Sequence, residues 1–251
     1  MPRIGYLNND GAWLSVYRDV LDIEMHTGPV VFDTSTRWPV RFASVDILII
    51  PWAPDAVWIA VHRKQLIRFM ARGGLLIALG EFESDWLPNM IWTKAIENDV
   101  TITTGQLSAD GTRAREMIFA NLTDAALSKW SDTCHGSFRG LPEDADVLAT
   151  NAAGNPIVVF DGKSTRGALL ASSIDPDFHA YAQNADAQQM FRQIIRWALL
   201  YADEEGGYRG WEFRMPRWTD ISRRVAPALP TVVIEGTIAV LVAAAVVLLW
   251  H

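Results

Sequence analysis

Cysteine and positive charge are both scarce in this sequence. Cys134 is the single cysteine among 251 residues, which excludes an intrachain disulfide and a metal site built from several thiolates. Lysine and arginine number 22 against 29 aspartates and glutamates, so the formal net charge is -7. Because nucleic-acid binding requires clustered positive charge, we expect no nucleic-acid partner. Acidic substrates are disfavoured for the same reason.

The N-terminus lacks the pattern of a secretory signal. Residues 1–11, MPRIGYLNNDG, run directly into a strand-like stretch, without the charged, apolar and small-residue succession of a signal peptide. The single cysteine is also typical of a reducing compartment. We therefore expect the bulk of the chain to lie in the cytoplasm.

Strand and helix patterns alternate along most of the chain. Half of the residues are hydrophobic, which is enough for a large core. Residues 45–52, VDILIIPW, are apolar on both faces, as in a parallel sheet that is covered on each side. The patterns predict strands at 3–7, 45–52 and 75–79 and helices at 10–24 and 56–74. This succession predicts an α/β fold with a mainly parallel sheet sandwiched by helices.

A more antiparallel group of strands is predicted further along. DVLATNAAGNPIVVFDG (146–162) and STRGALLASS (164–173) carry strand patterns with turns at Gly154-Asn155 and Asp161-Gly162. Residues 186–202 then have the single apolar face of an amphipathic helix. This helix is expected to close the domain.

The C-terminal residues form the longest apolar run. TVVIEGTIAVLVAAAVVLLWH (231–251) reaches the roughly 20 residues that a helix needs to cross a bilayer. Arginines precede this run and only His251 follows it, so the positive-inside tendency places residues 1–230 in the cytoplasm. We predict a single-pass, tail-anchored protein of the inner membrane. The alternative is a buried core helix at the end of a soluble domain.

Three segments are therefore expected. Residues 1–202 would form the α/β domain, residues 203–230 an Arg/Trp-rich juxtamembrane linker, and residues 231–250 a transmembrane helix in contact with the lipid bilayer. The linker mixes aromatic and basic side chains, so it would either lie along the lipid headgroups or fold back over the domain. Both interpretations stay open.

Several stretches together resemble a known superfamily. They are DILIIPW followed by a helix and FMARGGLLIALGEF, then CHGSFRGLPEDADVLATNAAGNPIVVF, and finally GALLASSIDPDFHAYAQNADAQQMFRQIIRWAL. Over about residues 1–202 the chain resembles the class I glutamine amidotransferase-like superfamily, and most closely its ThuA-like (trehalose-utilisation-like) branch. The resemblance implies a flavodoxin-like, amidotransferase-like sheet between helices. It implies a carbohydrate link by analogy alone.

The resemblance draws attention to Glu81. In working amidotransferases of this superfamily a cysteine follows the strand-end glycine, with a histidine and an acid as partners. Glu81 stands at that place here, and a carboxylate cannot act as the thiolate nucleophile. The position matching the histidine falls in SSIDPDFH, which would bring Asp175, Asp177 and His179 to the ligand-binding carboxyl edge of the sheet. Glutamine hydrolysis by the usual route is therefore not expected.

Glu81, Asp175 and His179 allow two interpretations. As catalytic residues they would act as a general acid and base, or hold a divalent metal. As structural residues, Glu81 would cap a helix beginning near Ser84 or pair with an arginine, and Asp175 would open a turn before Pro176. No metal site is assigned, and no cofactor is predicted.

Asp10, His135, Asp177 and Trp52 are candidate ligand-binding residues. Asp10 follows the first predicted strand, although its NNDG context is also that of a helix-capping turn. His135 would either line the same cleft or be a loop histidine bonded to its neighbours. Residues 85–95, DWLPNMIWTKA, are expected to expose an apolar surface where a protein partner docks.

These patterns are compatible with two functions. The first is a non-catalytic binding or assembly module in a complex with a membrane-associated protein. The second is a hydrolase or metal-dependent enzyme that acts on a small polar or carbohydrate-like substrate through Glu81, His135, Asp175 and His179. A small-molecule ligand fits either function. We favour the first, because the nucleophilic cysteine is missing.

Overall fold

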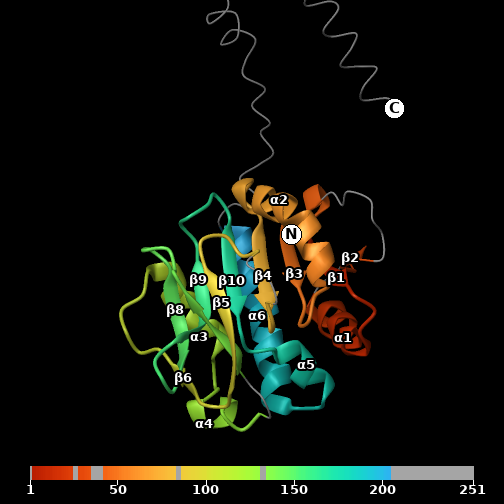
Figure 1. The fold of residues 1–251 in the computed structure, drawn as a ribbon. Coiled ribbons are helices and arrows are strands. Elements are labelled where there is room, and N and C mark those ends of the chain that lie inside the picture. Colours follow the sequence, from red (N-terminus) through yellow and green to blue (C-terminus); the bar gives the residue numbers. More distant parts are fainter. Residues whose placement is uncertain (1, 25–27, 35–41, 83–85, 131–133, 205–251) are drawn as a thin grey trace, which may run out of the picture. The chain divides into compact units, whose positions relative to one another are not determined.

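The computed structural model describes residues 2–24, 28–34, 42–82, 86–130 and 134–204 (Figure 1). The chain divides into two units, Met1–Arg209 and Gly210–His251, and every described residue belongs to the first. The predicted anchor, residues 231–250, and nearly all of the predicted linker lie outside the described residues. Among the described helices, none is both long and apolar enough to cross a bilayer. The three predicted segments stay predictions.

An eight-stranded sheet forms the centre of the first unit (Figure 1). In spatial order its strands are β2 (Val30–Asp33), β1 (Ile4–Asn8), β3 (Ile47–Ile50), β4 (Leu75–Leu79), β10 (Ala168–Ser172), β9 (Pro156–Asp161), β8 (Asp146–Asn151) and β6 (Val100–Ile102). The strands from β2 to β10 run parallel, and β9, β8 and β6 continue the sheet antiparallel. The mainly parallel α/β sheet is thus confirmed, and the antiparallel group occupies one flank.

Helices accompany the sheet along the described chain. They are 3-10 turns at Ala12–Leu14 and Phe42–Ser44, then α1 (Ser15–Glu24), α2 (Ala56–Ala71), α3 (Ala109–Ile118), α4 (Asp124–Leu127), α5 (Pro176–Tyr181) and α6 (Ala185–Glu204). The carboxylate of Asp55 accepts the Val57 and Trp58 N–H groups and so fixes the start of α2. The helices predicted at 10–24, 56–74 and 186–202 correspond to α1 with its 3-10 turn, α2 and α6.

Side chains of the central strands alternate between two core clusters. Ile47 and Ile49 of β3 belong to the cluster that α1, α3 and α6 complete. Leu48 and Ile50 of the same strand belong to the cluster that α2 completes. Because both faces of β3 are covered, the strand is apolar throughout, as the sequence pattern predicts.

A separate antiparallel ribbon, β5 (Ile91–Glu97) with β7 (Cys134–Arg139), is absent from the sequence-based expectations. Phe138 of β7 packs in the same core cluster as Val159 of β9 and Leu169 of β10. The ribbon therefore covers part of the sheet face on which α2 also packs.

The exposed apolar surface predicted for residues 85–95 is wrong in its first half. Trp86, Leu87 and Met90 are 2%, 4% and 4% exposed and belong to the core cluster that includes Phe138. Ile91 is 41% exposed. The described residues of this stretch before β5 have no regular period, yet their large apolar side chains pack in the same core cluster as Phe138 of the ribbon. The absence of a regular hydrophobic period in this stretch therefore does not predict that its apolar side chains are exposed.

Candidate functional site

The carboxyl edge of the parallel strands joins segments that are far apart in sequence. The Gly80 N–H, just after β4, donates to the Ser172 carbonyl at the end of β10, at 2.7 Å. The His135 N–H of β7 donates to the Ser173 carbonyl at 3.1 Å. The Trp92 indole N–H of β5 also donates to the Ser173 hydroxyl, at 3.0 Å. The ribbon is thus fastened to the edge where open α/β sheets bind ligands.

Five side chains form a continuous line at this edge, which we call the charged cluster. Glu81 Oε1 lies 3.2 Å from Lys94 Nζ and 3.1 Å from His135 Nδ1. His135 Nε2 lies 3.2 Å from Asp175 Oδ2, and His179 Nε2 lies 3.3 Å from Asp175 Oδ1. Each carboxylate therefore lies between two basic side chains.

Burial increases from one end of the charged cluster toward Asp175. The Lys94 side chain is 58% exposed and that of Glu81 is 16% exposed, whereas Asp175 is fully buried. The ring nitrogens of His135 and the carboxylate oxygens of Asp175 are close to their partners, but no aligned hydrogen bond satisfies them. These contacts act through charge and proximity more than through directed hydrogen bonds.

The neighbours of His135 shift its protonation. Burial alone would lower the pKa of His135, but the carboxylates of Asp175 and Glu81 outweigh burial and raise the pKa above its ordinary value. A protonated imidazole at this position offsets negative charge on both sides. The charged cluster is therefore close to self-compensating.

Asp177 lies beside the charged cluster and ties three segments together. It is fully buried, and its Oδ2 accepts the Tyr17 hydroxyl of α1 at 2.8 Å and the Trp52 N–H after β3 at 3.0 Å. Burial raises the pKa of Asp177 to about 6, with the Trp52 N–H opposing the rise and the charge of Asp175 adding to it. Burial also raises the pKa of Tyr17 well above its usual range.

An aromatic wall borders the site. The Trp52 ring centroid lies 4.4 Å from that of Phe178, 5.1 Å from Trp13 and 6.2 Å from His135. Gly80 has φ +82°, and a Cβ there would lie 2.3 Å from Trp52 Cδ1. Glycine at position 80 therefore allows Trp52 to pack against the turn that carries Glu81.

The single cysteine also lies at this edge. The backbone of Cys134 forms an isolated antiparallel β-bridge with that of Ile174, although the two residues are far apart in sequence. Its Sγ donates to the Gly136 carbonyl at 2.9 Å, and burial raises the pKa of the thiol. A buried, protonated thiol cannot replace the nucleophile that is missing at Glu81.

The structure brings all of the predicted site residues together except Asp10. Those within the site are Glu81, His135, Asp175, His179, Asp177 and Trp52. Asp10 does not join them: it is exposed, and its N–H donates to Asn8 Oδ1. Nor does its side chain cap a helix, because the 3-10 turn Ala12–Leu14 has Gly11 as its N-cap residue and no side-chain cap.

Two structural interpretations of these residues need correction. Glu81 pairs with a lysine, not with an arginine, and Ser84, near which the helix that Glu81 would cap is expected to begin, lies outside the described residues. His135 is a strand residue of β7, not a loop histidine. Within the described ranges, no group of three or more His, Cys, Asp or Glu residues is arranged to hold a metal ion.

Lys94 and Tyr17 are site residues that sequence reasoning missed. Lys94 lies opposite Gly136 in the β5–β7 pairing, so its place depends on a contact between segments far apart in sequence. Tyr17 has the helical spacing of an ordinary core aromatic, and nothing in its local sequence indicates a buried carboxylate partner. The local sequence around Lys94 and around Tyr17 therefore does not indicate that either is a site residue.

Several solved structures are similar to this chain. A glutamine amidotransferase of Thermotoga maritima is 7% identical, with a TM-score of 0.53 over 78% of this chain and 98% of its own. A GMP synthase-type protein of Thermoplasma acidophilum is 13% identical, with a TM-score of 0.52 over 82% and 98%. A ThuA-like protein of Bacteroides uniformis is 13% identical, with a TM-score of 0.42 over 78% and 90%.

These likenesses concern the fold alone. No protein-family model and no curated protein matches the chain. One of the matched structures is much longer, and this chain spans 36% of its length. Placement in the ThuA-like branch stays a prediction, because the TM-score to the ThuA-like structure is low. The described domain has a class I glutamine amidotransferase-like fold.

Proposed function

We propose that this domain is a non-catalytic binding or assembly module. The supporting observation is that the side chain at the nucleophile position, Glu81, and the single thiol of the chain, Cys134, are both already engaged within the protein. Glu81 is held between Lys94 and His135, and the Cys134 thiol is buried. A cysteine nucleophile has to form a thiolate and has to reach its substrate. Burial opposes both for the Cys134 thiol, whose pKa is raised, and Glu81 has no thiol and is held in two ion pairs.

The same edge has features that suit binding. Trp52 is only partly buried and packs near His135, while the Lys94 side chain at the outer end of the charged cluster is more than half exposed. Aromatic rings near charged groups are common at binding hot spots, because a ring contributes contact area at a small entropic cost. We place the binding surface here, around Trp52 and the exposed end of the charged cluster.

The proposal includes a tether to the inner membrane through residues 231–250, with the α/β domain on the cytoplasmic side. Support comes from the length of the apolar run and from the arginines that precede it. A tether would confine the domain to the membrane surface and raise its effective concentration near membrane-bound partners. Weak contacts with such a partner would then be sufficient for assembly.

One specific feature supports an enzyme as the second candidate. His135 lies between two carboxylates, and its pKa is raised, which is an arrangement that general acid-base catalysis can use. The substrate would be small and polar or carbohydrate-like. In this alternative the ionised Glu81 is indispensable, whereas in the binding module it is not.

Replacing Glu81 by Gln separates the two candidates. For a binding module we expect Glu81→Gln to keep its biological role and its co-purifying partners, because the side chain keeps its size and hydrogen-bonding capacity and loses only its ion pairs with Lys94 and His135. Glu143→Gln, at an exposed position in the loop before β8, is the matched control. Loss of the role in a folded Glu81→Gln protein, with Glu143→Gln unaffected, would contradict the binding module.

Removal of residues 231–251 tests the tether. We expect the shortened chain to move from the membrane fraction to the soluble fraction, because the apolar run supplies most of the free energy of membrane insertion. Joining an unrelated single-pass helix after residue 230 should restore membrane association. A shortened chain that stays in the membrane fraction after a high-salt wash would refute the tether.

The protonation of the His135 imidazole can be followed by NMR as the pH is changed. We expect the imidazole to titrate above its ordinary pKa, and Asp175→Asn to lower its pKa by removing the larger of the two stabilising charges. Because the folded-state pKa is raised, the stabilisation is full below about pH 6.5 and is lost as the pH rises through the folded-state pKa. Glu143→Gln should leave the titration unchanged. An unshifted His135 in the wild-type protein would contradict the self-compensating cluster.

A further inference from the structure

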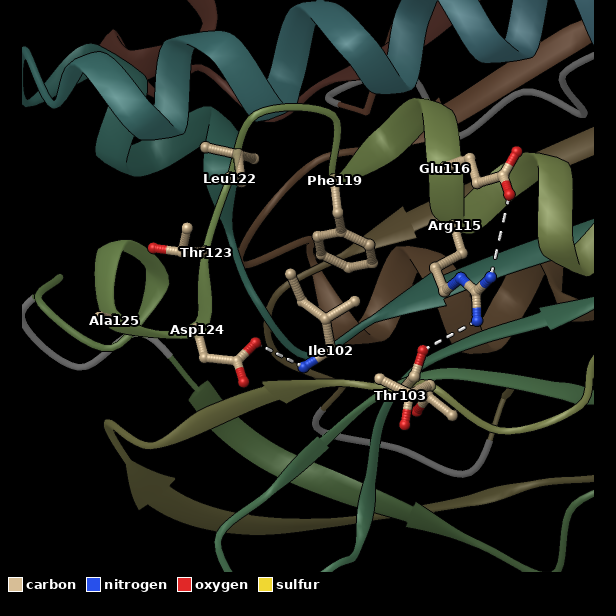
Figure 2. A pocket seen from close by; sticks show the side chains of 10 residues that line it. Ile102, Thr103, Arg115, Glu116, Phe119, Leu122, Thr123, Asp124 and Ala125 are labelled. Carbon is tan, nitrogen blue, oxygen red and sulfur yellow. Dashed lines mark hydrogen bonds and ion pairs between the residues drawn. The ribbon is translucent and has the colours of Figure 1, made fainter.

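A second concave site lies outside the charged cluster. It is a pocket of about 650 Å³, a size typical of small-molecule sites, between the end of β6, the last turns of α3 and the start of α4 (Figure 2). None of the residues that line it belongs to the charged cluster. The pocket is therefore a separate feature, and what it binds does not depend on the proposed function.

A guanidinium group lies at one end of the pocket. Arg115 Nη1 donates to the Thr103 carbonyl at 3.0 Å, which fixes the side chain (Figure 2). The nearest carboxylate is that of Glu116, 4.0 Å from Nη2 and 68% exposed, so this ion pair is weak. Arginine has five N–H donors in a fork that matches a carboxylate. The fork of Arg115 thus has capacity for an anionic group.

A carboxylate lies at the opposite end. Asp124 Oδ1 accepts the Ile102 N–H at 2.9 Å, which holds the side chain in place (Figure 2). Asp124 is exposed, and within the described chain its carboxylate makes no other hydrogen bond or ion pair. Its second oxygen is therefore suited to a cationic or N–H donor group.

An apolar floor separates the two charges. In Figure 2 the side chains of Ile102 and Phe119 lie between Arg115 and Asp124. Phe119 and Leu122 are 5% and 7% exposed, so their side chains form a firm, packed base. The lining changes from positive to apolar to negative along the pocket.

From this order we infer that the pocket binds a small zwitterion whose two charges are separated by an apolar segment, namely a short apolar peptide. The C-terminal carboxylate of the ligand would meet Arg115, its N-terminal ammonium group would meet Asp124, and its aliphatic side chains would lie over Phe119. A simple anion fits less well, because Glu116 and Asp124 would repel it. A simple cation would be repelled by Arg115.

Calorimetric titration of the full-length protein in mild detergent with the Leu-Leu dipeptide and with the Leu-Leu-Leu tripeptide tests this assignment. We expect binding of at least one of them, with a shift of the Ile102 amide resonance in NMR spectra, because that N–H is bonded to Asp124. N-acetyl-Leu-Leu and Leu-Leu amide each lack one charge, and each should bind about tenfold more weakly or worse than Leu-Leu.

Variants of the protein test whether the ligand binds in this pocket. Asp124→Asn keeps an oxygen that can accept the Ile102 N–H but removes the charge, and it should weaken binding about tenfold. Glu116→Gln should strengthen binding, because it removes the carboxylate nearest to Arg115. Glu81→Gln should leave binding unchanged, which separates this site from the charged cluster. The assignment is overturned if neither zwitterion binds at about 10 mM, or if a folded Asp124→Asn protein binds as tightly as the wild type.

Discussion

The buried carboxylate of Asp175 is the group on which the arrangement of the carboxyl edge depends. A charge removed from water is strongly destabilising unless opposite charges lie close to it. His135 of β7, whose pKa is raised, provides that compensation at 3.2 Å, and His179 Nε2 of α5 lies 3.3 Å from the other carboxylate oxygen. Loss of one partner from such a buried pair typically costs about 3–5 kcal/mol. The pairing therefore holds the ribbon against the sheet, and through the ribbon it brings Lys94 to Glu81.

The sequence predicts the parts of the fold whose signal is local. Strands β3 and β4 are apolar on both faces, and α6 has one apolar face, so their positions follow from periodicity. The β5–β7 ribbon has no such signal. Ile91 pairs with Arg139 across a long stretch of chain, and the buried Trp86 packs in the same core cluster as Phe138 of this ribbon. Contacts of this kind depend on tertiary packing, which overrides local pattern.

The candidate site also has some residues whose proximity the sequence predicts and others whose place it does not. Glu81, Asp175 and His179 follow strand ends, and parallel strands bring their carboxyl ends to one edge, so their proximity could be predicted. The partners that determine the chemistry of the site could not. Lys94 comes from the ribbon and engages Glu81, while His135 lies between the carboxylates because of its place on β7. The carboxylate of Glu81, at the nucleophile position, is thus part of a network of charges that compensate one another.

A double-mutant cycle between His135 and Asp175 tests this central interaction most directly. The free energy of unfolding would be measured for the wild type, His135→Gln, Asp175→Asn and the double variant under identical conditions. If the two groups compensate each other, the double variant should be less destabilised than the sum of the single variants, with a coupling of about 1–3 kcal/mol. Additive effects would show that the residues are neighbours without a stabilising interaction, and would contradict the account.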